Sequence, residues 1–371
     1  MNDKSLKIAF LEDDTADGGL GMVFRALAKE LSQDNEIIYI SHRKEKEEVK
    51  EYATYVNLPF HSSAGEEENG LLKSLCGVFP LIKIIYEEQP DLVISFGFYS
   101  NIRVCIAGRF FRKTKILISE RGNAKRFKYF VLFAVNTIFR RADGFVFQSN
   151  AAKAVFSKRI QKKSAVIYNA VFKDIPSRKS IKRNNYIVSV GRFHPDKNFL
   201  LLIDAFAMIA DRYPECELVI YGEEEPGSML HYGNEMKERI AFYNLETRIK
   251  LPGQFSNVLE HIVDARMFVL PSDLEGMPNA LVEAMACGLP VITTDFDPGN
   301  AGEFVINNEN GLIVRRGDAC GLAAAMEKYL NNPDFAQQLG KHAAETRIVF
   351  SKEKIFQKWR DYIHQICDQS R

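Results

Sequence analysis

The sequence has almost no net charge, no long hydrophobic run and no closely spaced cysteine pair. Its 49 basic and 48 acidic residues leave a formal charge of +1, which argues against a protein that binds nucleic acid through an overall basic surface. No window approaches the ~18 unbroken apolar residues of a membrane-spanning helix. The six cysteines are scattered, which predicts free thiols rather than a zinc site or a disulfide framework.

The start of the chain has no pattern typical of a secretory signal peptide. The polar residues Met1–Lys7 run directly into the short apolar stretch Ile8–Leu11, whereas a signal peptide needs a longer apolar region and a small-residue cleavage site. Together with the scattered thiols, this favours a cytoplasmic protein.

Short apolar runs alternate with helical patterns, and the alternation occurs twice. At ~150 residues per domain, 371 residues suggest roughly two domains. In the first half we expect strands at Lys7–Leu11, Glu36–Ile40, Leu92–Phe96, Lys115–Ser119, Gly144–Gln148 and Ala165–Tyr168, with helices such as Met22–Leu31 and Leu71–Glu88. In the second half we expect strands at Tyr186–Val190, Glu217–Tyr221, Arg248–Leu251, Met267–Leu270 and Pro290–Thr294, and helices at Phe199–Tyr213, Met229–Tyr243, Val258–Val263 and Asn279–Cys287.

This alternation predicts an α/β protein with two doubly wound, Rossmann-like domains. The polar, basic segment between the halves is typical of a linker. An amphipathic pattern over Lys352–Cys367 predicts a final helix. The expected divisions are an amino-terminal domain, a linker, a carboxy-terminal domain and a last helix, over residues 1–173, 174–185, 186–350 and 351–371. Ligands of such sheets bind at the carboxyl ends of the strands, so the turns there carry most information.

A glycine-rich turn follows the first strand and precedes the first helix. Gly18, Gly19 and Gly21 lie within four positions, which would let backbone amides approach a ligand. The helix that follows would offer unpaired N–H groups to an anion. A tight turn without a ligand explains the same residues.

The loop Gly191–Asn198 follows the first strand of the second half. Arg192 and Lys197 in this loop form a suitable pair for a diphosphate. Such a pair could neutralise a departing phosphate without a metal. Two solvated cations on a turn remain the alternative. His194 between them is more simply a residue of the turn than a catalytic group.

Two glutamates, Glu275 and Glu283, follow the strand Met267–Leu270. Pro278 suits a first helical turn and Gly288 suits the residue after a helix end. Glu275 then lies in a loop and Glu283 about a turn and a half into the helix. Because the neighbours of Glu283 are small or apolar, we expect its carboxylate to be half buried, which is costly unless the group is used.

These motifs resemble those of family-4 retaining glycosyltransferases, the glycosyl transferases group 1. Glu275 and Glu283 with the run EAMACGLPVI are similar to the family's E-x7-E signature. The loop GRFHPDKN resembles its Gly-Arg…Lys loop, and Gly18-Gly19 resembles its glycine turn. The resemblance covers the whole chain in order. It implies the GT-B fold: two facing Rossmann-like domains, with a carboxy-terminal helix that returns to the amino-terminal domain.

The resemblance also implies roles for individual residues. Glu283 would bind the ribose hydroxyls of a nucleotide sugar, and Glu275 would hold the transferred sugar. Arg192 and Lys197 would stabilise the leaving diphosphate. The remaining donor contacts would come from Gly18, Gly19, Gly191 and from the amides of Gly276, Met277 and Asn279. The family needs neither a metal nor any cofactor beyond the nucleotide-sugar donor, which is a co-substrate.

The chain departs from many relatives after the strand Lys115–Ser119. A histidine common in the family is replaced here by Ser119-Glu120-Arg121, a variant that resembles polysaccharide-assembly members. Glu120 or Arg121 could orient the acceptor, or the two could form an ion pair at a strand end. The motif Asp295-Phe296-Asp297 could suggest a metal-binding DxD, but a polar turn is the simpler interpretation.

Residues 103–141 combine many cations with aromatic side chains. One acid, Glu120, accompanies eleven cations at positions 103, 109, 112, 113, 115, 121, 125, 126, 128, 140 and 141. Such a segment suits an anionic membrane surface or a lipid diphosphate. A buried helix with solvated ends is the alternative. The sugar-donor motifs make single-stranded nucleic acid a poor candidate for this segment.

We therefore expect a hexosyltransferase at the inner face of the cytoplasmic membrane. It would move a hexose or N-acetylhexosamine from a nucleotide diphosphate sugar, with UDP favoured, to a lipid-linked saccharide in polysaccharide or glycan biosynthesis. Two alternatives stay open: another GT-B enzyme such as a sugar-nucleotide epimerase, and a two-domain sugar-binding protein without chemistry.

Overall fold

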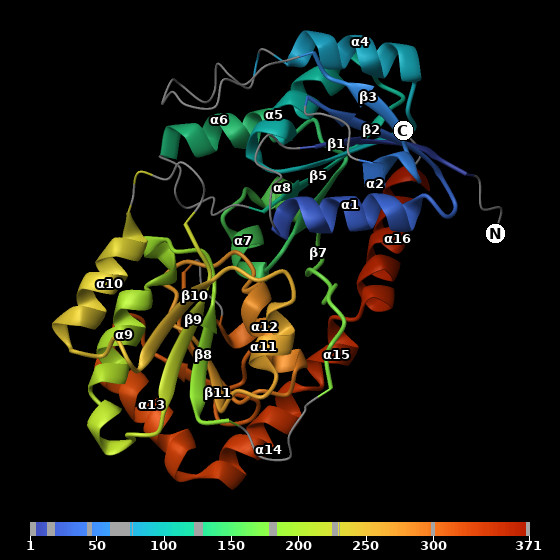
Figure 1. The fold of residues 1–371 in the computed structure, drawn as a ribbon. Helices are drawn as coiled ribbons and strands as arrows, with labels where there is room; N and C mark the ends of the chain where they lie inside the picture. Colours follow the sequence, from blue (N-terminus) through green and yellow to red (C-terminus); the bar gives the residue numbers. More distant parts are fainter. Residues whose placement is uncertain are drawn as a thin grey trace. The chain divides into compact units, whose positions relative to one another are not determined.

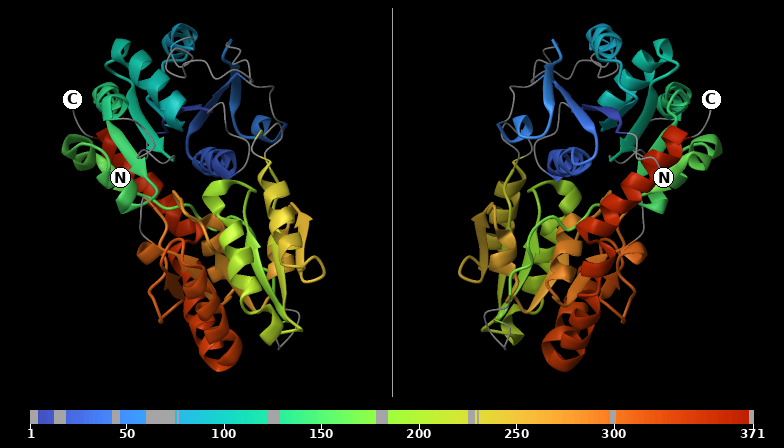
Figure 2. Two further views of the ribbon diagram at one scale, coloured as in Figure 1. Left: turned by 90° about the vertical axis from the view of Figure 1, so that its left-hand side faces the viewer. Right: turned by 90° about the vertical axis from the view of Figure 1, so that its right-hand side faces the viewer.

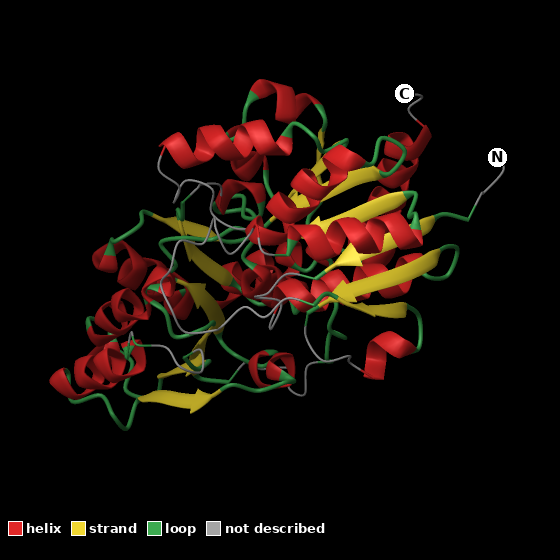
Figure 3. Cartoon of the chain, turned by 90° about the horizontal axis from the view of Figure 1, so that it is seen from above, coloured by secondary structure: helices red, strands yellow, loops and turns green. Residues whose placement is uncertain are grey.

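A computed structural model of the chain describes residues 5–12, 19–42, 47–59, 75, 77–121, 129–177, 184–224, 229, 231–297 and 301–368. The chain divides into two compact units. Unit 1 comprises Met1–Ala170 with Glu353–Arg371, and unit 2 comprises Val171–Lys352. Each contains a parallel sheet between helices, as the sequence predicts (Figures 1 and 3). Among the described residues, no helix has the length and apolar character needed to cross a bilayer.

Unit 1 contains a seven-stranded parallel sheet of order β3-β2-β1-β4-β5-β6-β7. Its strands are β1 (Lys7–Leu11), β2 (Glu36–Ser41), β3 (Thr54–Asn57), β4 (Leu92–Phe96), β5 (Lys115–Glu120), β6 (Gly144–Phe147) and β7 (Ser164–Val166). Its helices are α1 (Gly19–Leu31), α2 (Glu47–Lys50), α4 (Val78–Glu88), α5 (Phe98–Ala107), α6 (Tyr129–Phe139), α7 (Asn150–Ala154), α8 (Lys158–Lys162) and α16 (Lys352–Asp368). The central strands are buried on both faces, which explains their continuous apolar runs.

Alternate residues of the unit 1 strands pack against different helices, because successive side chains of a strand point to opposite faces. Ala9 and Leu11 join the core formed with α4, α5 and α6. On the opposite face the ring of Phe10 contacts that of Phe24 in α1, at 5.1 Å between centroids.

Helix α16 completes the opposite face of this sheet. Trp359 is fully buried and stacks on Phe96, at 5.6 Å between ring centroids. The hydroxyl of Tyr362 accepts a hydrogen bond from the Phe145 amide and donates one to the Lys163 carbonyl. Arg360 forms an ion pair with Glu30 of α1. The return of the last helix to unit 1 is therefore confirmed (Figure 2).

Unit 2 contains a six-stranded parallel sheet of order β10-β9-β8-β11-β12-β13. Its strands are β8 (Tyr186–Val190), β9 (Glu217–Tyr221), β10 (Ile249–Gly253), β11 (Met267–Leu270), β12 (Val291–Thr294) and β13 (Leu312–Val314). Its helices are α9 (Phe199–Ala207), α10 (Tyr232–Phe242), α11 (Val258–Ile262), α12 (Asn279–Ala286), α13 (Ala319–Asn331), α14 (Pro333–Ala343) and α15 (Thr346–Val349). Helices α9, α10 and α13 contribute to the larger core of this unit, whereas α12 packs against β11 and β12.

Both sheets reverse their winding direction beside their first strand. In unit 1 the reversal lies between β1 and β4, and in unit 2 it lies between β8 and β11. Loops after the two strands diverge at such a point and leave room for a ligand. In unit 2 these are the loops that carry Lys197 and Glu275.

Several predicted boundaries were wrong. Strands β3 and β13 were missed because they are short, and β3 is only partly buried. For the helix predicted over Leu71–Glu88, the end at Glu88 is confirmed, whereas residues 71–74 and 76 lie outside the described part of the chain. The helix predicted over Phe199–Tyr213 ends at Ala207 and is followed by a short 3-10 turn. Pro278 precedes α12 rather than occupying its first turn.

Candidate active site

The loop after β8 has a fixed shape because its own side chains cap the next helical segments. The amide of Asp196 donates to Nδ1 of His194 at 3.1 Å, so this histidine caps a short 3-10 turn. Asn198 adopts a left-handed conformation and its side chain accepts from the Leu201 amide at the start of α9. His194 therefore shapes the loop, in line with the simpler interpretation of the sequence.

The loops after β8 and β11 are hydrogen-bonded to each other. The amides of Asp273 and Leu274 donate to the Asp196 carbonyl at 2.8 and 3.3 Å. The side-chain amide of Asn198 donates to Oδ2 of Asp273 at 3.0 Å. Residues from two distant parts of the sequence thus form one rigid edge at the switch point of the sheet.

The Asp295-Phe296-Asp297 segment supports this edge through its backbone. The Glu275 amide donates to the Asp297 carbonyl at 3.0 Å, and the Asp297 amide donates to the Asp273 carbonyl at 2.9 Å. Phe296, the middle residue of this segment, is buried. Within the described ranges, no group of three or more His, Cys, Asp or Glu side chains is arranged to hold a metal ion.

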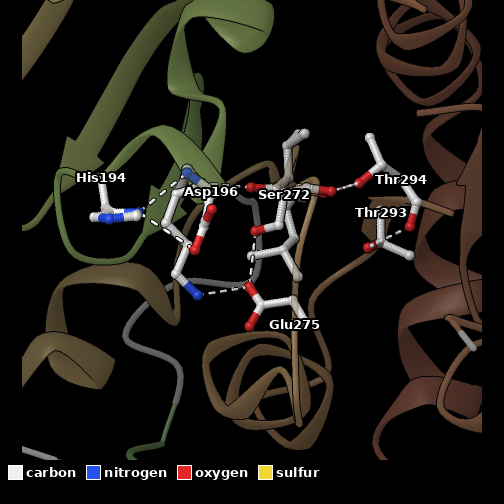
Figure 4. A network of polar contacts seen from close by, with 10 residues as sticks. His194, Asp196, Ser272, Glu275, Thr293 and Thr294 are labelled. Carbon is white, nitrogen blue, oxygen red and sulfur yellow. Dashed lines mark hydrogen bonds and ion pairs between the residues drawn. The ribbon is translucent and has the colours of Figure 1, made fainter. Parts of the chain in front are cut away.

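Glu275 is the centre of a buried polar network that joins the two loops (Figure 4). Its side chain is 6% exposed. Oε1 accepts a hydrogen bond from Lys197 Nζ at 2.7 Å and another from Ser272 Oγ at 2.7 Å. Thr294 in turn donates to the Ser272 carbonyl. Both of the hydrogen bonds that Glu275 accepts end on Oε1.

Helix α12 begins beside this network. The side chain of its capping residue, Pro278, makes no capping hydrogen bond, and the Asn279 amide donates to the Met277 carbonyl at 3.0 Å. Gly276, Met277 and Asn279 form the approach to the helix, and Met277 is buried. Gly191 follows β8 directly, and Arg192 beside it is exposed.

The far end of α12 is closed by a Schellman motif. Gly288 has φ of +70°. Its amide donates to the Met285 carbonyl at 2.8 Å, and the Leu289 amide donates to the Ala284 carbonyl at 3.1 Å. The sequence prediction that Gly288 follows the end of this helix is confirmed.

Glu283 forms an ion pair that the sequence did not predict. Its side chain is 12% exposed, and Oε2 lies 3.3 Å from Nζ of Lys173. Burial raises the pKa of the Glu283 carboxyl, while the Lys173 ammonium acts in the opposite direction. The two residues are 110 positions apart, and no spacing motif could have linked them.

In unit 1, Gly18 lies outside the described residues and Gly19 opens α1. A second group missed by the sequence analysis lies at the end of β1. Glu12 is buried, accepts a hydrogen bond from Ser41 Oγ at 2.7 Å and lies 3.5 Å from the Arg25 guanidinium. An isolated acid after a strand carries no spacing signal, so this cluster could not be identified beforehand.

Glu120 and Arg121 are held inside unit 1. Asn101 donates to Oε2 of Glu120 at 3.4 Å. Arg121 donates from Nε to Ser119 Oγ at 2.8 Å and from Nη1 to Asn169, and its guanidinium lies 4.3 Å from the centroid of Phe96. Burial lowers the pKa of the Arg121 guanidinium. The Arg121 guanidinium also lies 5.9 Å from the centroid of the Trp359 ring, so Arg121 contributes to the contact between β4 and α16.

The basic aromatic segment is less exposed than its composition suggests. Arg103 is 1% exposed, so it cannot contact a membrane surface. Arg141 donates to the carbonyls of Gly108, Phe111 and Thr114. Residues 122–128 lie outside the described part of the chain. The remaining exposed residues include Arg109, Phe110, Arg112, Lys113 and Arg140.

Two protein-family models match consecutive parts of the sequence. Residues 17–174 match the model for Glycosyltransferase Family 4, and residues 171–346 match the model for Glycosyl transferases group 1. Together the two matches include the glycine turn, the Arg192 and Lys197 loop and both glutamates, and they divide the chain close to Ala170, where the two units meet in the sequence.

Relatives of similar length carry transferase names. A Campylobacter jejuni protein named GalNAc-alpha-(1->4)-GalNAc-alpha-(1->3)-diNAcBac-PP-undecaprenol alpha-1,4-N-acetyl-D-galactosaminyltransferase is 25% identical over 374 residues, covering 97% of this chain and 99% of that one. The Capsular polysaccharide biosynthesis glycosyltransferase CapM of Staphylococcus aureus is 24% identical and covers 86% of this chain and 89% of that one.

The fold is also that of solved structures. Anabaena Alr3699/HepE, crystallised in complex with UDP, superposes with a TM-score of 0.81 at 20% sequence identity, covering 97% of this chain and all of that chain. This likeness establishes the GT-B arrangement of elements within the chain.

Proposed function

Because the chain belongs to the group 1 glycosyltransferases, with an amino-terminal family 4 domain, we propose that it transfers a hexose or N-acetylhexosamine from a UDP-sugar to a lipid-linked saccharide. The transfer retains the anomeric configuration, needs no metal and serves polysaccharide or glycan assembly. The UDP complex of Alr3699/HepE favours the uridine donor, and the name of the Campylobacter relative favours an undecaprenol-linked acceptor.

The observation that carries the proposal is the contact between Lys197 and Glu275. A cation from the loop after β8 and a carboxylate from the loop after β11 meet at 2.7 Å at the switch point of the sheet. A ligand with both an anionic and a hydroxylated part fits this pair. A nucleotide diphosphate sugar has both.

In this reaction the bond between C1 of the sugar and the diphosphate breaks, and its electron pair leaves with the diphosphate. Arg192 and Lys197 stabilise that negative charge, Glu275 holds the sugar and Glu283 holds the ribose. The acceptor oxygen bonds to C1 on the same face, and its proton passes to the departing diphosphate. In this proposal, catalysis rests mainly on preorganised charge.

Replacement of Glu283 by alanine tests this assignment. We expect Glu283→Ala to abolish transfer while circular dichroism and the melting temperature show a folded protein. Glu238→Ala, an exposed acid on α10, is the matched control and should keep full activity. Near-normal turnover of Glu283→Ala would refute the site.

Product analysis with a labelled donor separates the proposal from its rivals. Transfer should give a labelled lipid-linked product with the donor's anomeric configuration. An epimerised nucleotide sugar without transfer would indicate an epimerase. Binding of free sugar without affinity for a nucleotide would indicate a binding protein.

We further propose that unit 1 contacts the inner face of the cytoplasmic membrane. Phe110 is 68% exposed and lies among the exposed cations Arg109, Arg112 and Lys113. Apolar and basic groups together suit an anionic bilayer surface. Glu120 and Arg121 would act on the acceptor side from their position at the end of β5.

Sedimentation with anionic liposomes tests the membrane contact. Binding should fall as salt is added and should weaken in the double variant Arg112→Glu with Lys113→Glu. A double variant with the same charge change in unit 2, Lys237→Glu with Lys250→Glu, should bind like the wild type. Absence of binding at every salt concentration would remove the membrane contact from the proposal.

A further inference from the structure

Lys173, the ion-pair partner of Glu283, does not belong to a helix or strand. It lies in the segment between β7 and β8, outside any described helix or strand. Nearby, the Val171 amide donates to the Phe350 carbonyl at 2.9 Å, which ties this segment to the region before α16. The Lys173 ammonium lies 3.3 Å from Oε2 of Glu283.

The residues on either side of Glu283 in the sequence are apolar. Its sequence neighbours Val282, Ala284, Met285 and Ala286 are all buried. A carboxylate with little access to water needs a compensating charge or hydrogen bonds. Of the charged groups within the described residues, Lys173 is the one that acts on the pKa of Glu283.

The charged side chains on the other elements that pack against α12 are exposed or contact other groups. On α15, Arg347 donates to the Ala286 carbonyl. On α14, the His342 ring contacts the Glu309 carbonyl, and Lys341 is exposed. On α11, Glu260 is exposed and the His261 ring packs on Phe255. Strands β11 and β12 contain no titratable side chain.

We propose that Lys173 is a positioning residue for the nucleotide donor: it keeps Glu283 ionised and holds Oε2, so that Oε1 is presented to the ribose hydroxyls. This inference rests on the proposed function, since it takes Glu283 as the ribose-binding group. It adds a residue from the segment that leads into unit 2 to the donor site.

The physical consequence is a change in the pH dependence of donor binding. Burial already raises the pKa of Glu283, and loss of the opposing Lys173 charge would raise it further. The carboxylate would then become protonated at a higher pH and lose an acceptor for the ribose hydroxyls. As the pH is lowered, a protein without the Lys173 charge should therefore lose donor binding at a higher pH than the wild type.

Calorimetric titration of the full chain with UDP, from pH 5 to pH 8, tests the proposal. In Lys173→Met the dissociation constant for UDP should rise about tenfold, equivalent to about 1.4 kcal/mol, and the acid limb of binding should move to higher pH. Lys173→Arg should restore both, because it restores the charge. Lys237→Met, on the exposed surface of α10, should resemble the wild type.

The double variant Lys173→Met with Glu283→Gln shows whether Lys173 acts through Glu283. If it does, the effect of Lys173→Met disappears in the Glu283→Gln background. A purely structural role of Lys173 would lower the melting temperature without moving the acid limb, and that result would overturn the proposal. Lys173→Gln serves as a second variant if Lys173→Met does not fold.

The outcomes separate this inference from the proposed function. Weak UDP binding by Glu283→Gln with unaltered binding by Lys173→Met would refute the role of Lys173 alone. Unaltered binding by Glu283→Gln would refute the ribose role of Glu283 and this inference with it. If the wild type binds neither UDP nor GDP, the donor assignment itself fails.

Discussion

At the scale of single residues, the two glutamates of the candidate site lie in different environments. Glu275 is buried among polar partners and receives hydrogen bonds from Lys197 and Ser272. Glu283 is largely buried on helix α12, with Lys173 as its charged partner. The difference follows from their places in the chain, because a loop at a sheet edge brings polar groups together whereas a packed helix does not.

The burial of Glu283 predicts a pH-dependent stability. Because its folded pKa is raised, the folded state binds this proton more tightly than the unfolded state. The cost of ionising Glu283 is therefore absent below the unfolded pKa, near 4.3, and complete above the folded pKa. Relative to Glu283→Gln, the wild type should lose stability as the pH rises from 4 to 7.

Urea unfolding of both proteins across that range measures this difference. Parallel stability curves for the two proteins would show that Glu283 is ordinarily solvated, against the packing described here.

The cysteines should differ in their rates of alkylation. Burial raises the pKa of Cys105 to about 12 and that of Cys216 to about 11, while Cys320 is exposed. Since the thiolate is the reactive form, iodoacetamide at pH 8 should modify Cys320 well before Cys105, Cys216 and the buried Cys287. Peptide mapping by mass spectrometry reads each site separately. Rapid labelling of Cys105 in the native protein would contradict its burial in unit 1.

At the scale of elements, glycines hold the ends of β8 and β9 together. Gly222 has φ of +147°, and a Cβ added there would lie 1.8 Å from the carbonyl oxygen of Gly191. The Gly191 amide also donates to the Tyr221 carbonyl at 3.0 Å. The loop with Arg192 and Lys197 can therefore start only if position 222 has no side chain.

Alanine substitution separates this contact from backbone strain alone. Gly222→Ala should destabilise unit 2 by more than the ~1–3 kcal/mol of an unfavourable backbone conformation, because the backbones must also separate. Gly253→Ala is the control, since Gly253 has φ of +91° but open space around its Cβ position. Thermal unfolding compares the two. Equal losses of stability would show that the Gly191 contact is unimportant.

The sequence predicts the limits of a strand well where both faces of the sheet are buried at that strand. The limits of β1, β4, β8, β9 and β11 match the predicted runs, because short apolar runs bounded by turn residues indicate buried strands. Edge strands such as β3 mix polar and apolar residues, so their pattern is weak. Pairings such as Lys173 with Glu283 depend on the tertiary fold and leave no trace in local spacing.

At the scale of the whole molecule, each of the two units contains a hydrophobic core of its own. Trp359 is the only tryptophan of the sequence and belongs to unit 1. We expect the protein to unfold in more than one step, since chains with two cores often depart from two-state behaviour. Tryptophan fluorescence should follow one step, and far-ultraviolet circular dichroism should follow both.

The addition of UDP tests whether the two units unfold separately. A ligand stabilises the part that binds it, by about 2.7 kcal/mol at a concentration one hundred times its dissociation constant. Because Lys197, Glu275 and Glu283 all lie in unit 2, UDP should shift the circular dichroism transition more than the fluorescence transition. Coincident transitions that shift equally would show that the two cores unfold as one.

The split of unit 1 between both ends of the sequence has a consequence during translation. Phe96 emerges from the ribosome early, but Trp359, which stacks on it, is added only after all of unit 2 has been made. At ~5–20 residues per second, the ring of Phe96 waits many seconds for its partner. During that interval the nascent amino-terminal half exposes an apolar surface, and chaperones have their best opportunity to bind it.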